Sequence, residues 1–194
     1  MVGEEVDRAY LDMIAGLSLS PEAVRANRGM GIVYTPIHGT GVRLVPESLA
    51  RYGFENVIHV PEQDVNDGNF PTVVSPNPEE PSALKLALAK ADETGADLVI
   101  ATDPDADRIG IAVRRSEGEG GGMLLLNGNQ TGTLLTYYLL ERWKELGRLH
   151  PGQEKEFVVK TIVTTELIAR IAASFGVECY DVLTGFKFIA SVIR

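Results

Sequence analysis

Hydrophobic and polar residues follow two different periods along the chain, and together these predict an alternation of strands and helices. Short apolar runs predict strands, whereas apolar residues that recur every three or four positions predict helices. The expected strands are residues 31–34, 56–60, 97–101, 109–113, 123–126, 157–163 and 177–180, and the expected helices are residues 5–17, 45–52, 78–94, 129–146, 167–175 and 186–193. Strands that alternate with helices indicate an α/β fold.

The strand expected at residues 97–101 (DLVIA) is apolar throughout, which is typical of a strand covered by helices on both faces. We therefore expect residues 1–150 to form a three-layer α/β/α domain with a mixed sheet. Residues 151–194 begin a second α/β unit that stops in mid-element, so the chain has the organisation of a fragment. We expect the truncated unit to leave apolar surface uncovered and to self-associate, by exchange of this segment between chains.

Two helices are predicted in more detail. Asn77 can cap the helix that follows it, Pro78 suits the first helical position, and Glu80 can close a capping box. The longest helix, over residues 129–146, is expected to carry its apolar face on Leu135, Leu139, Trp143 and Leu146.

Charge and composition exclude several classes of protein. The 194 residues include 18 Lys and Arg against 27 Asp and Glu, a net charge of −9, whereas nucleic-acid-binding proteins present a basic face. The first residues lack the apolar core of a signal peptide, and no apolar run is long enough to cross a membrane. Cys179 is the only cysteine, which excludes an internal disulfide and agrees with a cytoplasmic location.

The strongest chemical signal is the motif DPDADR at residues 103–108, directly after the apolar strand. Asp103, Asp105 and Asp107 occupy alternate positions, so their carboxylates can converge on one point. At about 4 Å each pair of like charges costs roughly 1–4 kcal/mol, depending on the effective dielectric constant. A hard divalent cation offsets this repulsion, and oxygen ligands favour Mg²⁺, with Mn²⁺ or Ca²⁺ as substitutes.

The motif has three other interpretations to consider: an EF-hand loop, a solvated acidic turn and a phosphate-binding role for Arg108. An EF-hand loop needs Gly at its sixth position and Glu at its twelfth, where this chain has Arg108 and Arg114. A solvated acidic turn without an ion is the simpler alternative, but open α/β sheets bind ligands beyond the carboxyl ends of their strands. Arg108 either neutralises the neighbouring carboxylates or holds a phosphate with its guanidinium group, and the sequence leaves both roles open.

Further polar residues follow other predicted strands. The segment TPIHGTG at residues 35–41 can present backbone N–H groups to an anion, but a structural turn with a hydrogen-bonded His38 is favoured. Lys160 lies within a predicted strand, and Thr184, Gly185 and Lys187 follow the last strand. From the sequence alone, both lysines are expected to face solvent.

The motif DPDADR resembles the metal loop of the α-D-phosphohexomutase superfamily, which includes phosphoglucomutase and phosphomannomutase. The segments TPIHGTG, DGNFPTVVSPNPEEPSAL, VVKTIVTTELI and LTGFKFIA are also similar to family segments and occur in family order. The resemblance covers domain 2 and the first part of domain 3 of a four-domain enzyme. Such enzymes move a phosphoryl group between the anomeric and distal hydroxyls of a sugar phosphate, through a phosphoserine and a bisphosphate intermediate.

The resemblance implies roles for particular residues. Asp103, Asp105 and Asp107 would bind Mg²⁺, and Arg108 would contact the phosphoserine or the transferring phosphate. Lys160, Thr184, Gly185 and Lys187 would lie on the side of domain 3 that binds a hexose or pentose phosphate.

This chain also departs from the family pattern. It lacks the serine loop of domain 1, the later sugar-recognition loop of domain 3 and the whole of domain 4. We therefore expect the fragment alone to be inactive and to bind metal weakly.

Two other functions remain as alternatives. A haloacid-dehalogenase-type phosphatase also carries a DxD motif after a strand, but it wants Thr or Val where this chain has Asp107. A metal-binding module without catalytic activity would keep the fold alone.

Overall fold

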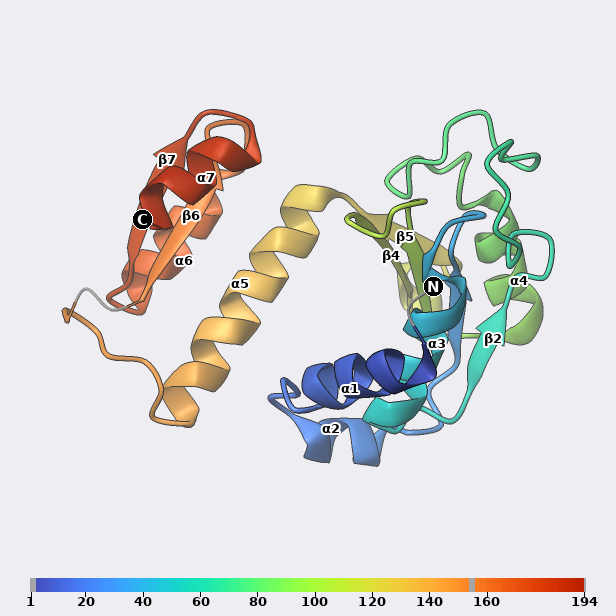
Figure 1. Ribbon diagram of the computed structural model, residues 1–194, viewed down its shortest axis with the longest axis horizontal. Coiled ribbons are helices and arrows are strands. Elements are labelled where there is room, and N and C mark those ends of the chain that lie inside the picture. Colours follow the sequence, from blue (N-terminus) through green and yellow to red (C-terminus); the bar gives the residue numbers. More distant parts are fainter. Residues whose placement is uncertain (1–2, 154–155, 194) are drawn as a thin grey trace. The chain divides into compact units, whose positions relative to one another are not determined.

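The computed structural model describes residues 3–153 and 156–193, which form two compact units, Met1–Asn127 and Gly128–Arg194 (Figure 1). The first unit contains α1 (Glu4–Ala15), α2 (Pro21–Ala26), β1 (Ile32–Thr35), α3 (Gly41–Tyr52), β2 (Val57–His59), α4 (Lys85–Thr94), β3 (Leu98–Thr102), β4 (Ile109–Arg114), η1 (Glu117–Glu119) and β5 (Met123–Leu126). The second contains α5 (Gly128–Glu145), β6 (Phe157–Thr161), α6 (Glu166–Ser174), β7 (Glu178–Val182) and α7 (Phe186–Ile193). Within the part of the chain that is described, no helix combines the length and the apolar character needed to cross a bilayer.

The first unit is built on one five-stranded mixed sheet with the strand order β2-β1-β3-β4-β5. β1 pairs in parallel with both β2 and β3, whereas β4 and β5 continue the sheet as an antiparallel meander. The chain passes from β1 through α3 to β2 on one side of β1, and from β2 through α4 to β3 on its other side. Since such crossovers are right-handed, the two helices must cover opposite faces of the sheet. The α/β/α layers and the mixed sheet predicted from the sequence are therefore confirmed.

The core of this unit lies mainly between the sheet and α4. Successive side chains of a strand point to opposite faces of the sheet. The register places Val33, Val99 and Ala112 beside one another on one face, across β1, β3 and β4. All three are fully buried, and Ala87 and Ala91 of α4 pack in the same cluster. On the other face α3 packs against α1, and the Tyr52 hydroxyl donates a hydrogen bond to the Ile14 carbonyl at 2.9 Å (Figure 1).

The helix predicted at residues 78–94 corresponds to α4, and its predicted start is wrong by one and a half to two turns. α4 begins at Lys85, and residues 77–84 form a series of turns instead. The expected local bonds do form, because the Asn77 side chain accepts from the Glu79 N–H at 3.0 Å and contacts the Glu80 carboxylate at 3.4 Å. Pro81 explains the delay: in a helix that began at Pro78 it would sit where the first intrahelical N–H donor is needed.

The boundary between the two units also differs from the expected one. It falls between Asn127 and Gly128 and not at residue 150, because α5 belongs to the second unit. There, Leu140 of α5 and the following Leu149 are buried with Ala172 of α6 and with Val177. The amphipathic pattern predicted the helix correctly, but it does not indicate which sheet or helix the apolar face will contact.

The apolar face of α5 likewise differs from the expectation. The buried residues are Thr131 and Leu140, whereas the four side chains expected to be covered are between 36% and 49% exposed: Leu135, Leu139, Trp143 and Leu146. The second unit holds only two described strands, β6 and β7, which pair in parallel. With α6 and α7 attached to this small sheet, much apolar surface stays exposed, including 77% of Phe186.

Candidate metal centre

The motif DPDADR forms the connection between β3 and β4. Thr102 at the end of β3 pairs with Ile109 at the start of β4, so residues 103–108 close an antiparallel hairpin. Within it, the Ala106 N–H donates to the Asp103 carbonyl at 3.0 Å, and Ala106 takes a left-handed conformation with φ 58°. This turn brings the chain back across itself, so that side chains at alternate positions end on one side of the loop.

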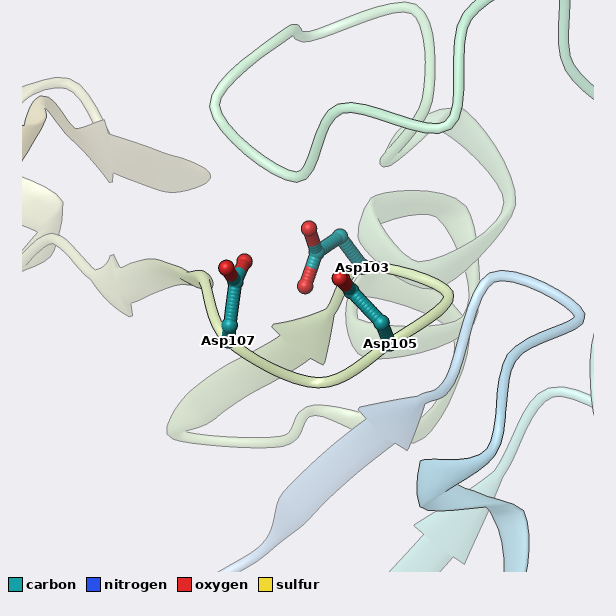
Figure 2. A group of neighbouring side chains, drawn as sticks. All are labelled: Asp103, Asp105 and Asp107. Carbon is teal, nitrogen blue, oxygen red and sulfur yellow. The ribbon is translucent and has the colours of Figure 1, made fainter. Parts of the chain in front are cut away.

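The three aspartates of this hairpin converge. Figure 2 shows the carboxylates of Asp103, Asp105 and Asp107 on the same side of the loop, and one oxygen from each lies within 4.8 Å of the others. In an octahedral magnesium site, ligand atoms about 2.1 Å from the ion are about 3–4 Å from one another, so small side-chain rotations close the site. Asp103 is buried and the other two are exposed, so one ligand is fixed while the site stays open to solvent.

Asp103 is held by its surroundings. One of its oxygens accepts a hydrogen bond from the Arg108 N–H at 3.0 Å, and its residue is only 7% exposed. Before it, the Thr102 hydroxyl forms a buried hydrogen bond of 2.9 Å with the Tyr34 hydroxyl of β1. Burial raises the pKa of Tyr34 to about 12, so this phenol stays neutral and keeps the hydrogen bond throughout the physiological range.

Arg108 lies beside the carboxylates without covering them. Its Nε is 3.7 Å from Asp103 Oδ2 and 3.8 Å from Asp107 Oδ1, and 63% of its side chain is exposed. The contacts match the first role considered for Arg108, partial neutralisation of the acidic group. Its exposure matches the second, because the remaining guanidinium N–H groups are open to an anion. The contacts thus confirm that Arg108 lies beside the carboxylates, and phosphate binding by Arg108 stays a prediction.

The segment TPIHGTG is a structural turn around a buried histidine, as favoured from the sequence. His38 is only 2% exposed, with its Nδ1 3.1 Å from the Val65 carbonyl and its Nε2 2.9 Å from Thr72 Oγ1. Because a carbonyl can only accept, Nδ1 carries a proton. Gln63 joins the same network through Thr72 at 3.1 Å and Thr35 at 2.8 Å.

Lys160 is not exposed to solvent, which corrects the expectation from the sequence. It is 4% exposed in β6, and its ammonium lies 2.5 Å from Asp181 and 2.8 Å from Glu166. The hydrogen bond to Asp181, followed by that to Glu166, raises the pKa of Lys160. A lysine can be buried in this way because two carboxylates neutralise its charge.

Sequence reasoning missed these two partners. One signal was present: β6 and β7 pair in parallel with Lys160 opposite Asp181, so an opposite-charge cross-strand pair follows once the register is assumed. The buried polar residues Thr35 and Gln63, which bond to each other at 2.8 Å, were also missed, and no sequence pattern points to them.

The other predicted residues of the second unit lie beyond the carboxyl end of β7. Thr184 and Lys187 are exposed, and Gly185 has a φ of 132°, a conformation that favours glycine. The Lys187 ammonium lies 5.0 Å from the centre of the Phe188 ring in the first turn of α7. Lys160, near the carboxyl end of β6, and Thr184–Lys187 therefore occupy the same end of the small parallel sheet.

Comparisons with known proteins identify both units. Residues 8–120 match the family model described as phosphoglucomutase/phosphomannomutase, alpha/beta/alpha domain II, and residues 127–194 match that for domain III. A phosphoglucomutase from Staphylococcus saprophyticus is 38% identical over 193 residues, which are 100% of this chain and 33% of that protein. The chain thus spans about a third of the length of this curated relative.

Solved structures share this fold. A phosphoglucomutase/phosphomannomutase family protein from Burkholderia thailandensis superposes with a TM-score of 0.73 at 23% identity, over 97% of this chain and 35% of its own. An N-acetylphosphoglucosamine mutase from Aspergillus fumigatus, in complex with glucose 1,6-bisphosphate, superposes with a TM-score of 0.51 at 19% identity, over 84% of this chain and 30% of its own. The two matched domains follow each other as the two units do, and the chain belongs to the phosphoglucomutase/phosphomannomutase family.

Proposed function

We propose that this chain is the metal-binding part of a sugar-phosphate mutase, an isomerase that moves a phosphoryl group between two hydroxyls of one sugar. The observation that carries the proposal is the convergence of Asp103, Asp105 and Asp107 at the end of β3, with the guanidinium of Arg108 beside them. Membership of the family supports this function over the phosphatase alternative.

The donor set fits magnesium. All three ligands are carboxylate oxygens, which hard divalent cations prefer, and an octahedral ion would leave further positions for water and a phosphate oxygen. Bound Mg²⁺ would supply neutralisation of the charge that develops on a transferring phosphoryl group. The chain's own residues would do the positioning: Asp103 holds a fixed carboxylate, while Asp105 and Asp107 close the site from the solvent side.

Arg108 would bind the phosphate directly. Its fork of N–H donors suits phosphate oxygens, and its exposure lets it exchange contacts with Asp107 for contacts with a substrate. The net charge of −9 does not prevent anion binding at this point, because charges farther than about 8 Å are screened at physiological salt.

The second unit would bind the sugar phosphate through Lys160, Thr184, Gly185 and Lys187. Lys187 and Thr184 are exposed and free to reach a ligand. Lys160 remains a cation because of Asp181 and Glu166, so it would engage a phosphate by giving up one carboxylate partner. The proposed ligand is a hexose or pentose phosphate and its bisphosphate. We also propose a cytoplasmic location, where such metabolites occur. Cell fractionation would check this location.

Metal binding is tested by titrating the purified chain with Mg²⁺ in a calorimeter, and with Mn²⁺ by electron paramagnetic resonance. We expect weak binding by the unaltered chain. Asp105→Asn should abolish it, because only two of the three carboxylates then remain to hold the ion. Asp92→Asn is the matched control, since Asp92 is an exposed acid outside the cluster, paired with Arg114. Equal binding by the Asp105→Asn variant, or a submicromolar dissociation constant for the unaltered chain, would contradict the proposal.

Mutase turnover is proposed for the longer protein and not for this chain alone. The phosphoserine donor is carried by a serine loop that these 194 residues lack. A coupled assay for glucose 6-phosphate should therefore give no signal above the enzyme-free control with the purified chain. Turnover by the chain alone would show that another residue donates the phosphoryl group.

We also propose that isolated chains self-associate through the second unit. Its exposed apolar side chains include Phe186 at 77% and Val163 at 72%, and its sheet contains only two described strands. Light scattering should show a mass that rises with concentration, and Phe186→Glu should reduce this rise. A monomer at every concentration would refute the proposal.

A further inference from the structure

The turn after β1 contacts the acidic hairpin at Pro104. The Thr40 N–H donates to the Pro104 carbonyl at 2.8 Å, and the Thr40 hydroxyl donates to the same oxygen at 3.1 Å. Pro104 lies between two of the three aspartates, so these donors hold the peptide unit that joins Pro104 to Asp105. Both lone pairs of this carbonyl are thereby used.

Gly39 allows this contact. A Cβ atom at position 39 would lie 2.4 Å from the Pro104 Cα, 2.7 Å from the Pro104 carbonyl oxygen and 2.8 Å from the Pro36 carbonyl oxygen. All three atoms belong to backbone, so no flexible side chain can move aside. Any residue larger than glycine must therefore push the two segments apart.

The turn itself is held rigidly, so it can act as a support. Ile37 and His38 both take left-handed conformations, with φ 46° and 61°, which is unfavourable for residues other than glycine. Ile37 is fully buried, and its N–H donates to Thr35 Oγ1 at 3.1 Å, while the His38 N–H donates to the Gln63 carbonyl at 3.0 Å. These contacts maintain a path that ends with Gly39 and Thr40 against the hairpin.

We infer that Gly39 and Thr40 are positioning residues for the magnesium site, acting through the backbone of Pro104. The inference rests on the proposed function, because it takes the three aspartates to be metal ligands. Neither residue contacts the metal. Each sets the distance between the turn after β1 and the hairpin, and thereby the mutual placement of the carboxylates of Asp103 and Asp105.

The test uses the whole chain with Gly39→Ala and Thr40→Val, and two matched controls. Gly68→Ala adds the same methyl group in a loop where nothing lies within 4 Å, and Thr94→Val removes an exposed hydroxyl that bonds only to the Lys90 carbonyl. Mn²⁺ binding is followed by electron paramagnetic resonance. We expect Gly39→Ala to weaken it at least about tenfold, as for other residues that support metal ligands, and Thr40→Val to weaken it about threefold since its N–H remains.

A second measurement needs no metal. The amides of Ala106 and Arg108 donate to the carbonyl and the carboxylate of Asp103, so hydrogen exchange at these two positions reports the shape of the hairpin. We expect faster exchange in both variants and unchanged exchange in both controls. A loss of stability alone would speed exchange throughout the unit and leave the Mn²⁺ affinity of the folded chain unchanged.

The outcomes separate the two ideas. If Gly39→Ala and Thr40→Val bind Mn²⁺ as the unaltered chain does, or if the controls weaken binding equally, the positioning role is refuted. If the unaltered chain binds no Mn²⁺, the proposed function fails, and amide exchange at Ala106 and Arg108 still decides whether the contact shapes the hairpin. If Gly39→Ala does not fold, Thr40→Val decides alone.

Discussion

The two units use the same order of elements in sheets of different width. In the first unit β1, α3, β2 and α4 lead into β3, so β1 lies between two parallel neighbours and all four of its residues are buried. In the second unit β6, α6, β7 and α7 repeat this order, but β6 has one described neighbour and only one of its five residues is buried. The difference shows that neighbours, and not the apolar sequence of a strand alone, determine how deeply the strand is buried.

The strand ends of the two units carry different sets of charged groups. The hairpin after β3 gathers three carboxylates, whereas at the carboxyl end of the sheet in the second unit Lys187 is exposed and Lys160 is buried beside Asp181 and Glu166. A parallel strand end is thus a place where either charge can be collected, and the local partners decide which. The three carboxylates have Arg108 as their neighbouring cation, while the one buried residue of β6, Lys160, has two anionic partners.

Removing an apolar side chain should cost far more stability in the sheet of the first unit than in that of the second. Ile32→Ala, at a site 1% exposed in β1, should lower the free energy of unfolding of the first unit by about 2–5 kcal/mol, because it removes a packed side chain and leaves a cavity. Phe157→Ala, at the equivalent first position of β6 and 40% exposed, should cost about 1 kcal/mol or less in the second unit. Urea unfolding followed by hydrogen exchange in peptides of each unit measures both. Equal costs would show that burial in the two sheets is alike.

A smaller effect is expected from the charge on Lys160. Since Asp181 and Glu166 raise its pKa above the ordinary 10.5, the folded state binds this proton more tightly than the unfolded state. Its contribution to stability is therefore complete below pH 10.5 and is lost as the pH rises through the folded-state pKa. Asp181→Asn should destabilise the second unit at neutral pH and weaken this dependence.

The single tryptophan, Trp143, lies in the second unit, so its fluorescence can follow this change. Urea midpoints at about pH 8 and about pH 11 are compared between the unaltered chain and Lys160→Met. Both proteins contain the same tyrosines, so the difference between them isolates Lys160. The prediction would be contradicted if the two urea midpoints differed by the same amount at neutral and at alkaline pH.

The smallest expected effect concerns the carboxylates of the first unit. Asp107 is 71% exposed beside two like charges, so Asp107→Asn should stabilise the metal-free chain by less than about 1 kcal/mol. Added Mg²⁺ should raise the midpoint of the unaltered chain and reverse the order of the two proteins. Thermal unfolding with and without Mg²⁺ checks both statements, and a destabilising effect of Asp107→Asn without metal would show that Arg108 already offsets the repulsion.

Much of this architecture could be predicted from the sequence, because each apolar run is short and bounded by turn residues. The buried run at residues 97–101 predicted β3 almost to the residue, and the alternate spacing of the three aspartates predicted their convergence. Local patterns sufficed there, since all three aspartates belong to one hairpin.

Features that depend on distant residues were predicted less well. The start of α4 was predicted too early because Pro81 outweighs a favourable local cap, and α5 was assigned to the wrong unit because an apolar face does not specify its partner. Lys160 was expected at the surface because its partners lie six and twenty-one residues later in the chain. The support of the hairpin by Gly39 has no local signature, since it exists only when two separate strand ends meet.

The acidic loop has both of its ends in one antiparallel ladder, Thr102 opposite Ile109, so the proposed ion binding would be coupled to the closing of that ladder. The three carboxylates come closest when β3 and β4 pair fully. Their repulsion would therefore oppose the last step of pairing, and a bound cation would favour it. Divalent ions would then slow hydrogen exchange deep within β3 and β4, several residues from any ligand. Through this hairpin, divalent ions at the proposed site would stabilise hydrogen bonds in the middle of the sheet.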